Sequence, residues 1–168
     1  MCSNTDLAKA FRERYTTVLF PLMNPDGVDM GHWRHNANGV DLNRDWGNFN
    51  QSETRLVKLY MEQVTKHSKG EVVAMLDFHS TWEDIFYTLS PKLKGNYPGL
   101  YPKMIKAMKN KIEGYEPNIS PRPINEPRIN SMTYFFHIYN AEAMVFEIGD
   151  NTPSEEITQK AIIAAKAY

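Results

Sequence analysis

The sequence predicts an α/β fold with a mainly parallel sheet flanked by helices, and two observations carry this prediction. Short apolar runs alternate along the chain with longer segments whose apolar residues recur every three or four positions. The run EVVAMLDF at residues 71–78 is almost continuously apolar, as in a central parallel strand covered on both faces. Strands that alternate with helices in this way build parallel sheets with helices on their faces.

The chain is predicted to begin with a short helix, a strand and a turn. Thr5 is a suitable cap for a helix that ends near Arg14. Residues 15–23 are rich in Val, Leu, Thr and Phe, which favours a buried strand. The sequence Asn-Pro-Asp-Gly at 24–27 is typical of a turn and ends that strand.

The loop at residues 24–46 has neither a helical nor a strand period, but it carries two arginines and several amides. The guanidinium groups of Arg34 and Arg44 suit a carboxylate or a developing oxyanion. A simpler interpretation of Arg44 is a salt bridge to Asp41 or Asp45 that holds the loop together.

The other elements follow from the same two periods. The expected helices are 52–67, 97–112, 131–139 and 152–168, and the expected strands are 72–78, 84–89 and 143–148. Residues 116–130 contain four prolines and no period, so they predict an ordered surface loop.

Two candidate functional residues lie at the ends of predicted strands, where α/β proteins bind ligands. His79 follows strand 72–78 and is a candidate metal ligand. Glu147 interrupts the apolar strand 143–148 and is a candidate general base whose pKa depends on its surroundings. The alternatives are a hydrogen-bonded or surface histidine and a glutamate paired with a basic neighbour.

Composition excludes several functional classes. The 168 residues, 42% of them hydrophobic, are enough for one domain with its own core. A net charge of −1 without a basic cluster argues against nucleic-acid binding. No run approaches the ~18 apolar residues of a membrane span, which argues against a membrane protein. The single cysteine, Cys2, permits no intrachain disulfide, and together with the lack of a signal-peptide core it favours a cytoplasmic location.

Five segments, in order along the chain, resemble the zinc carboxypeptidases, the M14 metallopeptidases. They are the strand leading into Asn-Pro-Asp-Gly at 24–27, Trp33-Arg34, Gly-Val-Asp-Leu-Asn-Arg at 39–44, Asp-Phe-His-Ser at 77–80 and Phe-Glu at 146–147. The resemblance extends from about residue 16 to about residue 151. It implies an α/β fold with a mixed sheet, a bound Zn²⁺ and hydrolysis of C-terminal residues from peptides.

The resemblance also implies a role for individual residues. His79 resembles the third zinc ligand, and Glu147 resembles the general base that takes a proton from the zinc-bound water. Arg34 resembles the arginine that polarises the scissile carbonyl. Asn43 and Arg44 resemble the pair that binds the free carboxylate of the substrate.

One part of the family pattern is missing. The first two zinc ligands of the family come from a His-x-x-Glu motif ahead of the Asn-Pro-Asp-Gly strand, and none of the five histidines here has a glutamate three positions later. One of three expected ligands, His79, is therefore present, and Asp77, Glu83 and His137 are the other candidates. We expect a single catalytic domain, residues 1–168, that lacks its N-terminal part and whose uncovered sheet edge self-associates.

Two alternative functions remain open from the sequence. The first is a metal-free module that binds the carboxylate of a peptide through Asn43 and Arg44. The second is a zinc amidohydrolase that acts on acylated amino acids or cell-wall peptides. All three functions require a peptide or amino-acid-like partner with a free carboxylate.

Overall fold

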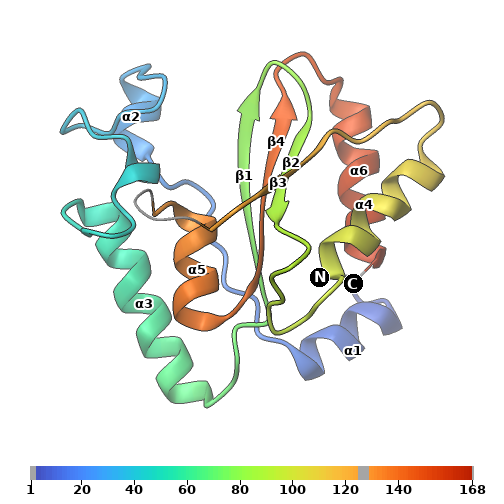
Figure 1. The fold of residues 1–168 in the computed structure, drawn as a ribbon, viewed down its shortest axis with the longest axis horizontal. Coiled ribbons are helices and arrows are strands. Elements are labelled where there is room, and N and C mark those ends of the chain that lie inside the picture. Colours follow the sequence, from blue (N-terminus) through green and yellow to red (C-terminus); the bar gives the residue numbers. More distant parts are fainter. Residues whose placement is uncertain (1–2, 125–128, 168) are drawn as a thin grey trace.

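The computed structural model describes residues 3–124 and 129–167, and it has an α/β architecture (Figure 1). Its elements are α1 (Asp6–Arg14), α2 (Pro25–Asp29), the 3₁₀ helix η1 (Leu42–Arg44), α3 (Ser52–Ser68), β1 (Ala74–Thr81), β2 (Ile85–Leu89), α4 (Leu100–Lys111), β3 (Ile119–Arg122), α5 (Ser131–Tyr139), β4 (Glu142–Gly149) and α6 (Ser154–Ala167). None of the helices in these ranges combines the length and the apolar character needed to cross a bilayer.

The four strands form one sheet in the order β1-β4-β2-β3. β1 is parallel to β4 and β2 is parallel to β3, whereas β2 and β4 are antiparallel. The prediction of a mixed, mainly parallel sheet is therefore confirmed. The register places Glu147 of β4 between His79 of β1 on one side and Ile85 of β2 on the other.

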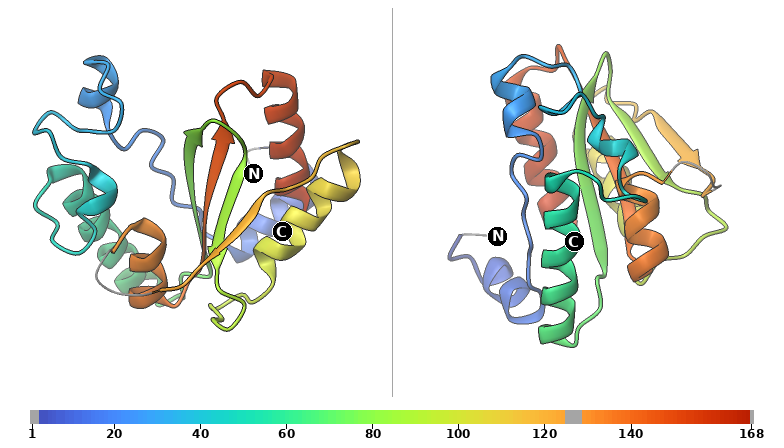
Figure 2. Two further views of the ribbon diagram at one scale, coloured as in Figure 1. Left: turned by 45° about the horizontal axis from the view of Figure 1, so that its top comes forward. Right: turned by 90° about the vertical axis from the view of Figure 1, so that its left-hand side faces the viewer.

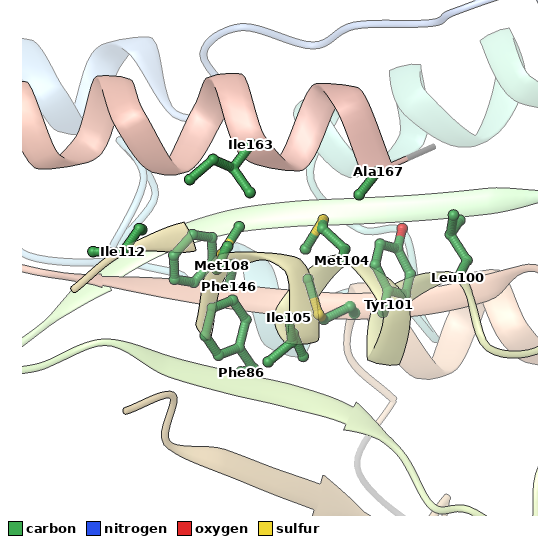
Figure 3. Packing of buried hydrophobic residues seen from close by; sticks show 11 residues of the cluster. Phe86, Leu100, Tyr101, Met104, Ile105, Met108, Ile112, Phe146, Ile163 and Ala167 are labelled. Carbon is green, nitrogen blue, oxygen red and sulfur yellow. The ribbon is translucent and has the colours of Figure 1, made fainter. Parts of the chain in front are cut away.

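Helices cover both faces of the sheet, with α4 and α6 on one side and α3 and α5 on the other (Figure 1). Successive side chains of a strand point to opposite faces. Met144 and Phe146 of β4 accordingly pack with α4 and α6 in the largest hydrophobic cluster, part of which is shown in Figure 3. Ala143 and Val145 pack on the α5 side, against Met132. Glu147 continues this second set, so its side chain belongs to the α5 face.

A second hydrophobic cluster fixes the long loop against the helices. Trp46, at the end of the loop, packs against Val57 and Met61 of α3 and against Tyr134 and Phe135 of α5. The ring centroids of Trp46 and Tyr134 are 5.5 Å apart. The predicted helices 52–67 and 131–139 thus form the support on which this loop rests.

The predicted buried strand at residues 15–23 is wrong. The segment is an extended coil between α1 and α2 (Figure 2), and it pairs with no strand in the described part of the chain. Val18 and Phe20 are half-buried on the second cluster, but Leu19 is 76% exposed and Leu22 is 54% exposed. The alternation is that of a strand with one covered face, and what is missing is a neighbouring strand to pair with its backbone.

Two other predictions of local structure also need correction. The Asn-Pro-Asp-Gly sequence begins a helix, because Asn24 Oδ1 accepts a hydrogen bond from Gly27 N at 3.1 Å and Pro25 occupies the first turn of α2. The proline-rich segment 116–130 contains the short strand β3, which pairs with β2; residues 125–128 lie outside the described ranges.

The strand predicted at 72–78 forms as β1, but it lies at the edge of the sheet and not at its centre. The central position belongs to β4, which has a neighbour on each side. Helix 97–112 forms from Leu100 onward as α4, and the last helix forms as α6; Tyr168, its predicted end, lies outside the described ranges.

Candidate active site

Buried polar side chains give the long loop its shape. Asn36 is 1% exposed, and its Oδ1 accepts hydrogen bonds from the backbone N–H groups of Asn38 and Val40, each at 3.1 Å. Its Nδ2 donates to Gln51 Oε1 at 2.9 Å and to Glu53 Oε1 at 3.0 Å. The loop therefore has a fixed conformation without regular secondary structure along most of its length.

Asp45 fastens the end of the loop to α3. Its carboxylate accepts hydrogen bonds from the backbone N–H groups of Asn50 and Gln51 and from the Thr54 hydroxyl. Asp41 Oδ1 accepts a hydrogen bond from the Asn43 N–H at 2.9 Å, and Asp41 Oδ2 lies 3.7 Å from Arg34 Nη1. Neither aspartate is thus the partner of Arg44.

Arg44 is exposed and donates through Nη1 to the carbonyl oxygen of Asn43 at 2.9 Å. Within residues 3–124 and 129–167 its guanidinium forms no ion pair with a carboxylate. The interpretation of Arg44 as a loop-holding salt bridge is therefore wrong for the described part of the chain. Its charge is available to a ligand.

Ser131, the first residue of α5, joins the loop to the sheet. Its backbone N–H donates to Asn43 Oδ1 at 3.0 Å, and its hydroxyl donates to Asp77 Oδ2 at 2.5 Å. Because Oδ1 of Asn43 is occupied, the amide Nδ2 is the group left to donate to a ligand. Asn43 and Asp77 are thus brought together by a residue far from both in the sequence.

His79 is oriented by Asp77. The two residues are two positions apart on β1 and share a face, and His79 Nε2 lies 3.0 Å from Asp77 Oδ2. This hydrogen bond raises the pKa of His79, although burial opposes the rise; the charges of Asp77, Glu147 and Asp41 add to it. Nδ1 of the ring makes no hydrogen bond to any part of the described chain and is the nitrogen free for a ligand.

Glu147 lies beside His79 across the β1–β4 pairing, and its side chain is half-buried. Burial raises the pKa of its carboxyl group, and the negative charges of Asp77 and Asp150 raise it further. The positive charges of His79 and Arg34 lower this pKa but do not cancel the rise. It forms no ion pair with a basic side chain in the described ranges, so the interpretation as a structurally paired glutamate is not borne out there.

Arg34 completes the group from the loop. Its guanidinium carbon lies 3.9 Å from the ring centroid of Trp33. Its positive charge opposes the rise in the pKa of Glu147. A shallow hollow of about 390 Å³ lies next to Arg34 and is lined by His32, Trp33, His35 and Gly39. Four of the five residues singled out from the sequence, namely Arg34, Asn43, His79 and Glu147, are therefore linked by these contacts and charges near the carboxyl ends of β1 and β4, and Arg44 follows Asn43 directly in the chain.

A complete catalytic zinc site does not fit the residues present. Zinc in such sites needs three protein ligands, and the described residues contain no group of three or more His, Cys, Asp or Glu that could hold a metal. Asp77 Oδ2 already accepts a hydrogen bond from the Ser131 hydroxyl and lies 3.0 Å from His79 Nε2. Glu83 is exposed and its Oε1 lies 3.5 Å from Asn118 Nδ2, and His137 lies in the last turn of α5, whereas it is the first residue of that helix, Ser131, that contacts Asp77. Of the four candidate ligands, His79 is the one with a ring nitrogen that is free and lies beside Glu147.

The sequence does not predict the hydrogen bond between Ser131 and Asp77 that joins α5 to β1 at this site. The sequence presents Asp77 only as an additional candidate metal ligand, and its spacing of two from His79 is the signal that both lie on one face of a strand. The resemblance implies that residues near 130–133 line the pocket for the terminal side chain, but the sequence does not predict that Ser131 joins Asn43 to Asp77, because that contact depends on α5 beginning next to both β1 and η1.

Comparisons with known proteins show the family of this chain. The sequence profile of the zinc carboxypeptidases, Peptidase M14, matches residues 1–102. Cytosolic carboxypeptidase 6 of Caenorhabditis elegans is 30% identical over 83 residues, which are 48% of this chain and 18% of the worm protein.

Two solved structures share the fold at low sequence identity. The metallo-carboxypeptidase from Burkholderia cenocepacia has a TM-score of 0.68 and 20% identity over 98% of this chain and 46% of its own length. The metallo-carboxypeptidase from Pseudomonas aeruginosa, in complex with (2-guanidinoethylmercapto)succinic acid, has a TM-score of 0.56 and 20% identity over 86% of this chain and 43% of its own length. The chain thus spans less than half the length of each of these proteins. Because the family profile covers more than half of its residues, the chain belongs to the zinc carboxypeptidase family.

Proposed function

We propose that the full-length protein removes C-terminal residues from peptides and that this chain supplies the groups that bind the terminal carboxylate and accept a proton. The observation that carries the proposal is the position of Glu147 beside His79, with the loop bearing Arg34, Asn43 and Arg44 tied to the same strand ends through Ser131.

Carboxylate binding is assigned to Asn43 and Arg44. Arg44 has an unpaired guanidinium in the described chain, and Asn43 has a free Nδ2 because its Oδ1 accepts from Ser131. A guanidinium and an amide donor from two consecutive residues suit a carboxylate, and charge-assisted hydrogen bonds are roughly twice as strong as neutral ones. Binding the free terminal carboxylate of a peptide restricts a peptidase to the C-terminal end of its substrate.

Proton transfer is assigned to Glu147. It is the carboxylate on the α5 face at the strand ends that has no ion-pair partner in the described residues, and it lies next to a histidine. It would take a proton from the attacking water, while Arg34 would stabilise negative charge on the carbonyl oxygen, an effect worth about 3 kcal/mol per donor. In the family Zn²⁺ supplies Lewis-acid chemistry; His79 would be one of its ligands, and the described residues do not complete the set.

The bound compound of the Pseudomonas structure is consistent with this assignment. It is a succinic acid derivative, so the related fold accepts a ligand with carboxylates. The same preference is expected of Arg44 and Asn43 here.

The test compares Glu147→Gln with Glu71→Gln in the full-length protein. Glu71 is exposed between α3 and β1 and serves as the matched control. Hydrolysis of a peptide with a free C-terminus should be lost in the first variant and kept in the second, and a peptide amidated at its C-terminus should resist all forms. Unchanged hydrolysis by Glu147→Gln would disprove the proposal.

A metal-free binding module is the second candidate function, because the described residues hold no group of three metal ligands. Zinc titration and elemental analysis of the purified protein separate the two candidates. One tightly bound zinc per chain supports the peptidase. No tight zinc, together with binding of free but not amidated peptides that Arg44→Met abolishes, supports the binding module.

A further inference from the structure

A buried ion pair lies behind the candidate site and is not part of it. Lys160 of α6 is only 4% exposed at its side chain, and buried lysines are rare unless they are paired. Its Nζ lies 2.5 Å from Asp84 Oδ2 and 2.6 Å from Glu156 Oε1. The ammonium is also 4.6 Å from the centroid of the Tyr115 ring.

Asp84 is the centre of this network. Its Oδ2 accepts hydrogen bonds from Lys160 and from the Tyr115 hydroxyl at 2.8 Å, and its Oδ1 accepts from the Gly149 N–H at 2.9 Å. Burial alone would raise the pKa of Asp84, but these three donors outweigh it and lower the pKa. The carboxylate therefore stays charged and holds α6, the segment after α4, and β4 together.

The network meets β4 two residues beyond Glu147. Gly149 ends β4, and the residue after Asp84, Ile85, is the antiparallel neighbour of Glu147. There is little free space at Gly149, since a Cβ there would lie 3.0 Å from Thr152 Oγ1 and 3.2 Å from the Cα of Glu83. Asp84 thus holds the end of β4 and the start of β2, the two segments that flank the Glu147 backbone.

We propose that Asp84 and Lys160 are positioning residues that hold Glu147 beside His79; this inference rests on the proposed function. The carboxylate bond to Gly149 fixes the strand end, and the ammonium of Lys160 keeps that carboxylate charged and oriented. Neither residue belongs to the group that faces the substrate, so both act through the backbone of β4.

The test replaces Lys160 with methionine in the full-length protein, with Lys109→Met as a control. Lys109 pairs with Glu116 at 2.6 Å, and its side chain is half exposed. Lys160→Met should lower kcat by roughly tenfold with an unchanged KM, because small displacements of a reacting group have large costs. Hydrogen exchange in a peptide spanning β4 should speed up in this variant and stay unchanged in Lys109→Met.

Two further variants keep the test decisive if Lys160→Met folds poorly. Tyr115→Phe removes one donor to Asp84 and should change kcat in the same direction by less. Adding Asp84→Asn to Lys160→Met removes the unpaired buried charge, and the new amide oxygen can still accept from Gly149, so kcat should partly recover.

Unchanged kcat and unchanged exchange at β4 in the folded variants would overturn the inference, as would a loss of kcat that the double variant deepens. If the unmodified protein shows no peptide hydrolysis at all, the proposed function fails. Exchange at β4 then decides the inference by itself.

Discussion

β4 and β1 are equally long, run parallel and both end at the candidate site, but their surroundings differ. β4 has a strand on each side and is buried on both faces from Glu142 to Phe146. β1 pairs only with β4 in the described ranges, and its Phe78 is 60% exposed. The protein therefore holds Glu147 by the packing and pairing of its strand, whereas it holds His79 at the edge by a side-chain hydrogen bond to Asp77.

The largest expected effect comes from truncating the core on the β4 side. Phe86 of β2 is fully buried and stacks on Phe146 with ring centroids 4.3 Å apart. Phe86→Ala should lower the free energy of unfolding by about 3–5 kcal/mol, because it removes a large buried side chain and leaves a cavity. Urea unfolding of both proteins measures the difference.

Phe78→Ala is the matched control on β1. The exposed ring has little buried area to lose, so the cost should be below about 1 kcal/mol. Equal losses in the two variants would mean that β1 is as well enclosed as β4, and the comparison would be wrong.

One edge of β1 pairs with no strand among the described residues, which predicts an effect on association. Exposed strand edges with apolar side chains promote pairing between chains, and charged residues suppress it. The 168-residue chain should therefore increase in apparent mass with concentration, and Phe78→Lys should reduce that increase. Light scattering over a concentration series measures both, and Ile162→Lys, an exposed site on α6, is the control. A monomer at every concentration would contradict the prediction.

Most of the secondary structure was predictable because it depends on local periodicity. The helices from Ser52 and Ser131 begin as expected, and the apolar positions of α4 face the core. The predictions that were wrong concern strands, whose formation and position depend on the strands beside them. Residues 15–23 have the composition of a strand but no strand beside them, and β1 has a central-strand composition at an edge position.

The candidate site shows the same difference between local features, which the sequence records, and contacts between distant residues, which it does not. The sequence alone singles out Arg34, Asn43, Arg44, His79 and Glu147, because motifs record the residue types that the chemistry needs, and their roles stay predictions. The contacts that hold them were not, since Ser131 and Asn43 are 88 positions apart and Lys160 and Asp84 are 76 apart. Such pairs follow only from the packing of α5 and α6 on the sheet.

A pH effect is expected at the buried start of β4. Burial raises the pKa of Glu142, and a hydrogen bond from the Gly95 N–H at 3.2 Å only partly opposes this. Because its pKa is higher in the folded than in the unfolded state, protonation favours folding. Its stabilising contribution is complete below the unfolded pKa of about 4.3 and is lost as the pH rises through the folded value.

Glu142→Gln should therefore be more stable than the unmodified protein at pH 7, and the difference should vanish at acidic pH. Glu71→Gln, at an exposed position before β1, is the control and should change little at either pH. Thermal unfolding over a pH series measures the effect. A difference that grows as the pH falls would contradict the sign of this argument.

The smallest effect concerns the residues that connect each strand to its preceding helix. α3 leads to β1 through Lys69 at φ 53°, and α5 leads to β4 through Asn140 at φ 50°, both left-handed. Glycine adopts this conformation without strain, whereas a lysine pays on the order of 1 kcal/mol. Lys69→Gly should therefore stabilise the protein by a few tenths of a kcal/mol after the entropy of the unfolded chain is counted.

Asn140→Gly should instead destabilise the protein, because Asn140 Nδ2 donates to Asn96 Oδ1 at 2.8 Å and the side chain helps to anchor the start of β4. Opposite signs in urea unfolding would support the contrast between the two strands, and equal signs would contradict it.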